Sequence, residues 1–124
     1  MAVEGFSVEV DGGPERADAG LRPESADATV VTVAGDVDLA AADTLWSVLD
    51  EYVRAGRSVV VDCSKVAFLD SMGLRTLIRA QQKADASGAR FTLASPSEPV
   101  LRVLQLAGVA DLFVLDFSES GSGS

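Results

Sequence analysis

Apolar and polar residues alternate strictly from Phe6 to Val10, a period of two that is typical of a half-buried β-strand. Residues 29–34 are β-branched and apolar and predict a second, more central strand that ends at Gly35. The intervening residues 11–28 are acidic, rich in Gly, Pro and Ala, and without periodicity. We therefore expect a mobile acidic loop there, longer than most hairpin connections.

Three later segments repeat their apolar residues at the spacing of one helix face. The first covers about residues 40–54 and the second begins near Ser71 and continues to about residue 86. The third follows residues 95–99, which supply cap-forming serines and prolines, and ends at Gly108. The apolar face of the first helix is the clearest of the three, and it consists of Leu45, Val48, Leu49, Tyr52 and Val53.

Strand patterns lie between these helices. Residues 58–63 include three consecutive valines, which predict a strand buried in the middle of a sheet. We expect residues 64–68 to be a short connection from this strand to the second helix. Residues 90–94 predict a further strand, and residues 112–117 predict a short edge strand.

The order of these elements is strand, strand, helix, strand, helix, strand, helix and short strand. Such alternation predicts an α/β fold with right-handed crossovers, and an antiparallel first strand would make the sheet mixed. We expect a single domain over residues 1–117 and a flexible tail over residues 118–124, which end in Gly-Ser-Gly-Ser.

Composition narrows the classes of function. No apolar run approaches the length of a membrane span, and the first residues lack the basic and apolar regions of a secretory signal. A single cysteine, Cys63, agrees with a reducing cytoplasm and is interpreted as core filler. The chain contains no histidine, which excludes Ser-His-Asp and Cys-His catalysis and argues against a zinc site.

The formal net charge is −9, from 19 acidic and 10 basic residues. Such a chain repels nucleic-acid phosphates, so we expect no nucleic-acid partner. An acidic surface would favour a basic protein partner, although the charge could equally serve solubility alone. No glycine-rich phosphate loop of the dinucleotide or P-loop type follows any predicted strand, and no cofactor is expected.

Residues 68–74, Phe-Leu-Asp-Ser-Met-Gly-Leu, join the end of a predicted strand connection to the start of the second predicted helix. Asp70 or Ser71 is the predicted N-cap of the second helix. Gly73 has no side chain and lets a partner approach the backbone of the first turn closely. A hydroxyl at Ser71 would lie beside unpaired N–H groups and the positive end of the helix dipole, which suits an anion such as phosphate. The simpler interpretation is an ordinary Asp/Ser cap.

Two further features have both a structural and a functional interpretation. Asp36 and Asp38 follow the second strand, where they could serve as turn and cap residues or as an acidic contact surface for a basic partner. Trp46 falls beside the apolar face of the first helix and could be a binding anchor, but peripheral packing is the safer interpretation.

Residues 68–74 resemble the phosphorylation motif of anti-sigma-factor antagonists of the bacterial STAS-domain family, in which a hydrophobic pair precedes Asp-Ser-x-Gly-Leu. Residues 35–39, Gly-Asp-Val-Asp-Leu, are similar to the Gly-Glu-Leu-Asp type of turn in the same family. One helix and one strand separate the two motifs, as in the family, and the resemblance extends over about residues 30–117. It implies the STAS fold, a mixed sheet with its helices mainly on one face.

The resemblance implies a cytoplasmic regulator that works by partner switching and is not itself an enzyme. In its unphosphorylated form it would bind an anti-sigma factor that is a serine kinase, and so release a sigma factor during a stress response. The kinase would phosphorylate Ser71, and a serine phosphatase would reverse this. The implied partner-binding residues are Asp36, Asp38, Asp70, Met72, Gly73 and Leu74.

Two residues depart from the usual family pattern. Met72 stands where a small Ser or Thr is common, and its bulk could slow or redirect the kinase. Arg75 stands where Gly is common, and it could pair with a phosphate on Ser71. One alternative function is a STAS scaffold or regulatory subunit of a transporter or stress complex, without turnover at Ser71. Another is an enzyme that uses carboxylates such as Asp36 or Asp70, which would need a pocket that strongly shifts their pKa values.

Overall fold

The computed structural model describes residues 2–3, 5–12 and 28–117. The predicted mobile loop at 11–28 and the predicted tail at 118–124 lie largely or wholly outside these residues. The elements in chain order are β1 (Ala2–Val3), β2 (Phe6–Gly12), β3 (Ala28–Val37), α3 (Leu39–Arg54), β4 (Ser58–Leu69), α4 (Ser71–Ala86), β5 (Phe91–Ala94), α5 (Glu98–Ala107), the 3-10 helix η1 (Ala110–Leu112) and β6 (Val114–Asp116).

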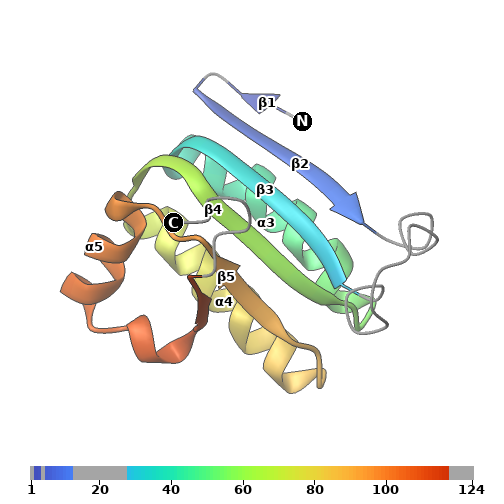
Figure 1. Ribbon diagram of the computed structural model, residues 1–124. Helices are drawn as coiled ribbons and strands as arrows, with labels where there is room; N and C mark the ends of the chain where they lie inside the picture. The colour runs from blue at the N-terminus through green and yellow to red at the C-terminus, as the bar shows by residue number, and fades with distance from the viewer. Residues whose placement is uncertain (1, 4, 13–27, 118–124) are drawn as a thin grey trace.

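All the strands in the described part of the chain belong to one six-stranded sheet, in which spatial order follows chain order from β1 to β6. The β1–β2 and β2–β3 pairs are antiparallel, and the pairs from β3 to β6 are parallel. The predicted mixed sheet is therefore confirmed, with the two-residue strand β1 as an addition (Figure 1).

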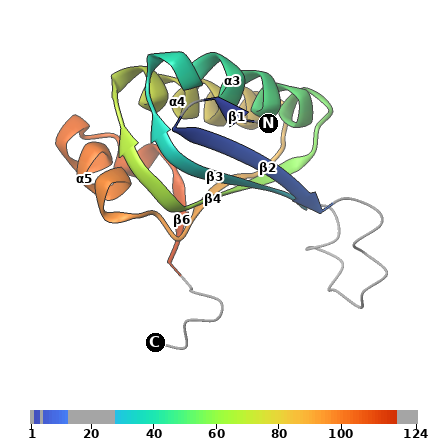
Figure 2. The same ribbon diagram turned by 90° about the horizontal axis from the view of Figure 1, so that it is seen from above.

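The helices cover mainly one face of this sheet, as expected. Each parallel strand is added on the same side of the preceding one, so right-handed crossovers bring the connecting helices to the same face. Figure 2 shows α3 and α4 over this face, with α5 displaced toward one end of the sheet. The carboxyl ends of β3 and β4 and the amino ends of α3 and α4 consequently meet at one edge.

The core lies between the sheet and these helices. Leu45, Leu49 and Val53 of α3 are at most 1% exposed, which confirms the helix face expected from their spacing. They pack with the valines of β3 and β4 in one hydrophobic cluster. Burying a side chain of this kind contributes about 1.5–3 kcal/mol, so this face anchors α3 to the sheet. Cys63 lies in the same cluster, where burial raises the pKa of its thiol to about 12, in keeping with a structural role.

The most informative difference from expectation is in β4. Residues 64–68, expected to be a connection, continue the strand to Leu69. The β3–β4 register shifts twice, so that β4 carries an extra residue on each occasion. These two bulges keep Cys63, Val66 and Leu69 buried at every third position, while Phe68 is turned outward. An alternating pattern is thus lost although the pairing continues.

Other element boundaries differ by only a few residues. The strand expected at 29–34 extends from Ala28 to Val37, which includes Gly35 and Asp36. The first strand also runs further, to Gly12, so the ends of the expected loop at 11–28 belong to β2 and β3. The final apolar segment begins as η1 and pairs only as the short edge strand β6.

Candidate functional site

The turns that follow β3 and β4 pack directly against each other. The backbone N–H of Asp70 donates to the carbonyl oxygen of Val37, with an N···O distance of 3.1 Å. Gly73 lies so close to the β3 end that an added Cβ would stand 2.6 Å from Val37 O and 2.7 Å from Val37 Cγ1. Because real Cβ atoms do not approach other atoms so closely, glycine is required at this position. The two sequence motifs thus form one surface.

Ser71 is the first residue of α4, and its side chain is exposed. Asp70 is the N-cap, which decides between the two predicted cap residues. Its Oδ1 accepts hydrogen bonds from the backbone N–H groups of Met72 and Gly73, both at 2.9 Å. The Ser71 hydroxyl takes no part in the cap, so it is free for chemistry without loss of the helix start.

The expectation that unpaired N–H groups surround this hydroxyl is wrong for most of the first turn. Asp70 occupies the donors of Met72 and Gly73, and the Leu74 N–H donates to the Asp70 carbonyl oxygen at 2.9 Å. Among the described residues, the N–H of Ser71 itself is the remaining first-turn donor without a partner. The helix start is thus largely satisfied by its own cap.

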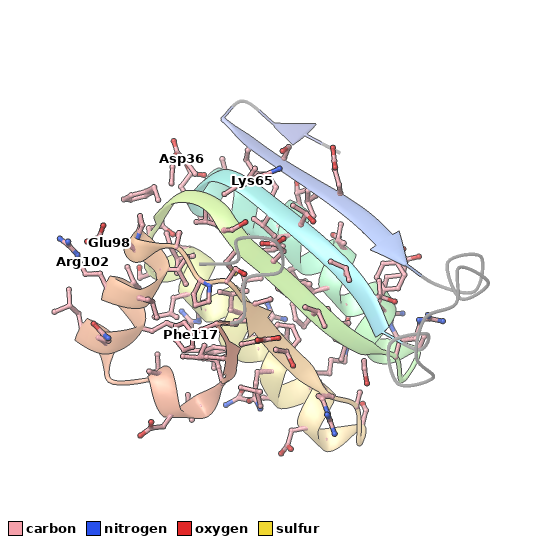
Figure 3. All side chains as sticks on the ribbon, viewed as in Figure 1. Asp36, Lys65, Glu98, Arg102 and Phe117 are labelled. Atoms are coloured by element: carbon pink, nitrogen blue, oxygen red, sulfur yellow. The ribbon has the colours of Figure 1, made fainter. Side chains whose placement is uncertain are left out.

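The two acidic residues of the neighbouring motif differ in role. Asp38 is the N-cap of α3, and its Oδ1 accepts from the Ala41 N–H at 3.1 Å, as the turn-and-cap interpretation predicted. Asp36 is exposed, and within the described part of the chain its carboxylate has no partner. Its own N–H donates to Gly5 O at 2.7 Å, so its backbone is fixed while its carboxylate points outward (Figure 3).

The apolar residues of the Ser71 motif also differ in exposure. Met72 is 36% exposed and available to a partner. Leu74 is only 8% exposed and packs in the core, so the expectation that it contacts a partner directly needs correction. Gly73 is also buried and acts through the close contact with Val37.

A groove at the end of β4 was not anticipated from the sequence. It has a volume of about 370 Å³ and lies between the end of β4 and the first turns of α5. Phe68, which is 49% exposed, lines this groove together with Glu98 and Arg102. Figure 3 shows the Glu98 and Arg102 side chains projecting from the first turns of α5. The groove residues are Phe68, Leu69, Glu98, Pro99, Arg102 and Val103. No local sequence pattern indicated it, because the bulges of β4 that leave Phe68 outside the core are visible only in the structure.

Several interactions hold α5 and the outer helices in place. The Ser97 hydroxyl does not cap α5 but donates to Val66 O of β4 at 2.7 Å. The Cζ atom of Arg79 lies 4.0 Å from the centroid of the Trp46 ring, and this packing between helices supports the peripheral-packing interpretation. Lys83 donates to Asp50 at 2.6 Å, and this hydrogen bond, opposed by partial burial, lowers the pKa of Asp50. The Trp46–Arg79 contact and the Lys83–Asp50 hydrogen bond join α3 to α4.

The described residues show no group of three or more Cys, Asp or Glu side chains arranged to hold a metal ion. None of the helices in this part of the chain has the length and apolar character needed to cross a bilayer.

Comparison with known proteins supports the resemblance found in the sequence. The model of the STAS domain family matches residues 22–121. The anti-sigma-B factor antagonist of Bacillus subtilis (strain 168) is 25% identical over 93 residues, which span 75% of this chain and 84% of that protein.

Two solved structures have the same fold. An anti-sigma factor antagonist from Mycobacterium paratuberculosis has a TM-score of 0.74 and 22% identity, covering 96% of this chain and 92% of its own. The Bacillus cell fate determinant SpoIIAA, in its phosphorylated form, has a TM-score of 0.60 and 19% identity, covering 76% of this chain and 86% of its own.

Proposed function

Because this chain belongs to the STAS domain family, we propose that it is an anti-sigma factor antagonist that switches partners through phosphorylation of Ser71. The unphosphorylated chain binds an anti-sigma factor that is a serine kinase, and the bound sigma factor is released. The name of the Bacillus subtilis relative supports this role. The observation that carries the proposal is the Ser71 hydroxyl, exposed at the first position of α4 and unused by its own fold.

The proposed reaction makes this chain a substrate of the kinase. The Ser71 oxygen forms a bond to the γ-phosphorus of ATP as the bond from that phosphorus to the β–γ bridging oxygen breaks. ADP leaves, and the hydroxyl proton passes to the kinase or to solvent. A serine phosphatase reverses the modification by transferring the phosphoryl group to water. The enzymes act on this chain, which contributes the hydroxyl and its fixed position.

Asp70 and Gly73 supply that position. Asp70 caps α4 through two hydrogen bonds, and Gly73 allows the first turn to pack on Val37. Ser71 is therefore presented from a helix start that is braced from two sides, and not from a loose loop. A rigid acceptor lowers the entropy that the kinase must remove when it aligns the hydroxyl with ATP.

The proposed partner surface surrounds this hydroxyl. Asp36 contributes an exposed carboxylate for a basic group, while Met72 and Phe68 contribute exposed apolar contacts. Leu39, at 65% exposure, lies at the start of α3 beside the Asp38 cap. Exposed apolar side chains grouped around a polar acceptor are typical of a protein-binding surface.

A phosphate on Ser71 would disrupt this complex. It carries a charge of about −1.5 to −2 at pH 7 and would enter a surface that already holds Asp70 and Asp36. A partner surface that suits these carboxylates and a neutral hydroxyl would then face repulsion and added desolvation. Like-charge contacts can cost several kcal/mol, and each 1.4 kcal/mol is about tenfold in affinity. We place this switch in the cytoplasm, where ATP and a reducing environment are available.

The proposal is tested by incubating the full chain with ATP and its cognate anti-sigma factor kinase, then measuring intact mass and mapping the modified peptide. We expect one phosphate, on Ser71, and none on the Ser71→Ala variant. That variant should still bind the kinase because it removes a hydroxyl and leaves the surrounding contacts. Phosphate on Ser64 or Ser95 with Ser71 unmodified would overturn the assignment. Binding without any phosphate transfer would favour the scaffold role.

A further inference from the structure

The start of α4 offers a phosphate fewer partners than an uncapped helix would. Asp70 already accepts from two first-turn N–H groups, and the N–H of Leu74 bonds to the Asp70 carbonyl oxygen. Asp70 also brings a negative charge next to the Ser71 hydroxyl. A phosphate at this position would therefore meet repulsion from the cap and, among the described residues, a single unpaired backbone donor. A nearby cationic side chain would therefore stabilise the phosphate more than the remaining backbone donor can.

The cations of α4 are Arg75, Arg79 and Lys83. Arg79 lies over the Trp46 ring, and Lys83 is hydrogen-bonded to Asp50. In the described part of the chain, Arg75 has neither an ion pair nor a hydrogen bond from its side chain, which is exposed. Arg75 is thus the uncommitted cation of this helix.

Helix geometry brings Arg75 to Ser71. The two residues are four apart on α4, so their side chains are neighbours on its surface. Both are exposed, whereas the core-facing side of α4 is formed by Gly73, Leu74, Thr76, Leu77, Ala80 and Ala84. An acidic group four residues before a basic one is the favourable order for such a pair. The planar guanidinium also matches the oxygens of a phosphate in two parallel hydrogen bonds.

We propose that Arg75 binds the phosphate on Ser71 within the same chain and holds it over the first turn of α4, an inference that rests on the proposed function. The pair offsets the repulsion from Asp70 and gives the phosphate one orientation. It also reduces the charge that the phosphorylated surface presents. The carboxylates of the two packed turns include the capping Asp70 and Asp38 and the exposed Asp36. Arg75 is a positioning residue for the modified state.

The test uses full-length protein with phosphoserine incorporated at position 71 during synthesis, so that no kinase is needed. The second ionisation of the phosphate is followed by ³¹P NMR as a function of pH. Arg75 favours the dianion, so Arg75→Gln should reduce the ionisation constant by about twofold or more and raise the titration midpoint. Arg75→Lys should keep at least half of the effect because it retains the positive charge.

Arg90→Gln is the matched control. It removes the same charge from an exposed side chain before β5, at the far end of α4 from Ser71, and should leave the midpoint unchanged. Equal midpoints in the parent and Arg75→Gln would overturn the inference, as would an equally large shift in Arg90→Gln. Since phosphoserine is introduced without the kinase, this result is independent of whether a kinase modifies Ser71. Failure of the inference and failure of the proposed function are therefore distinguishable.

Discussion

Gly73 at the start of α4 lies against Val37 at the end of β3, where an added Cβ would stand 2.6 Å from the Val37 carbonyl oxygen. The same oxygen accepts the N–H of Asp70. A single carbonyl thus connects the two turns that carry the sequence motifs. The spacing between Asp36 and Ser71 follows from this contact, which makes Gly73 a structural requirement of the site.

Gly73→Ala should destabilise the fold. At an open helix position this change would stabilise by up to about 1 kcal/mol, but here the new methyl group meets the backbone of β3. Forced overpacking of this kind costs about 1–3 kcal/mol. Urea unfolding of the variant, with Met72→Ala as an exposed neighbouring control, measures the effect. A Gly73→Ala protein as stable as its parent would show that the turns are not held together as described.

Asp36→Asn should slow association with the kinase and weaken the dependence of the association rate on salt. Its carboxylate is exposed, so it acts through long-range attraction to basic groups on the partner. Stopped-flow association at several salt concentrations measures both quantities. Asp43→Asn, exposed on the flank of α3, is the control for loss of one charge. If the Asp36→Asn rates and salt slope equal those of the parent, Asp36 is only a turn residue.

Phe68→Ser should weaken kinase binding by about tenfold or more, because buried aromatic anchors dominate the energetics of protein interfaces. The change should affect stability little, since the ring is already 49% exposed. Leu106→Ser removes a more exposed apolar side chain from the far end of α5 and serves as the control. Equal affinities for the two variants would show that the groove is not part of the kinase-binding surface.

Asp50 should contribute to stability in a pH-dependent manner. The hydrogen bond from Lys83, with help from Arg54, lowers its pKa in the folded chain. Its contribution is therefore present above its unfolded pKa of about 3.9 and is lost as pH falls through the lower folded value. Asp50→Asn should show a smaller drop in melting temperature than the parent between about pH 5 and about pH 3. An equal drop in both proteins would contradict this role.

Much of the fold could be predicted because local periodicity and burial agree in most elements. The spacing of Leu45, Leu49 and Val53 specifies a helix face that the sheet then covers. The extension of β4 could not be predicted in this way. Its two bulges replace the alternation of buried and exposed residues with burial of every third residue. The sequence of residues 64–68 therefore resembles a connection, although these residues remain in the strand.

The local structure around Ser71 was predictable in outline but less so in detail. Asp70 and Ser71 are both good capping residues, and only the geometry of the turn shows that Asp70 takes the helix donors. The groove depends on α5, which lies far along the chain from Phe68, so no local pattern could reveal it. Leu74 carries the apolar character of a contact residue, but the helix directs it into the core.

The central claim is that phosphate at Ser71 acts on the interface and leaves the fold intact. It is tested most directly by comparing the affinity of the kinase for the unmodified chain and for the chain with phosphoserine at position 71, with melting temperature recorded for both. The helix dipole favours the added charge by roughly 0.3–1 kcal/mol and Arg75 offsets the repulsion from Asp70, so the melting temperature should not fall. Affinity should drop at least about tenfold. Equal affinity of the two forms would contradict the switch.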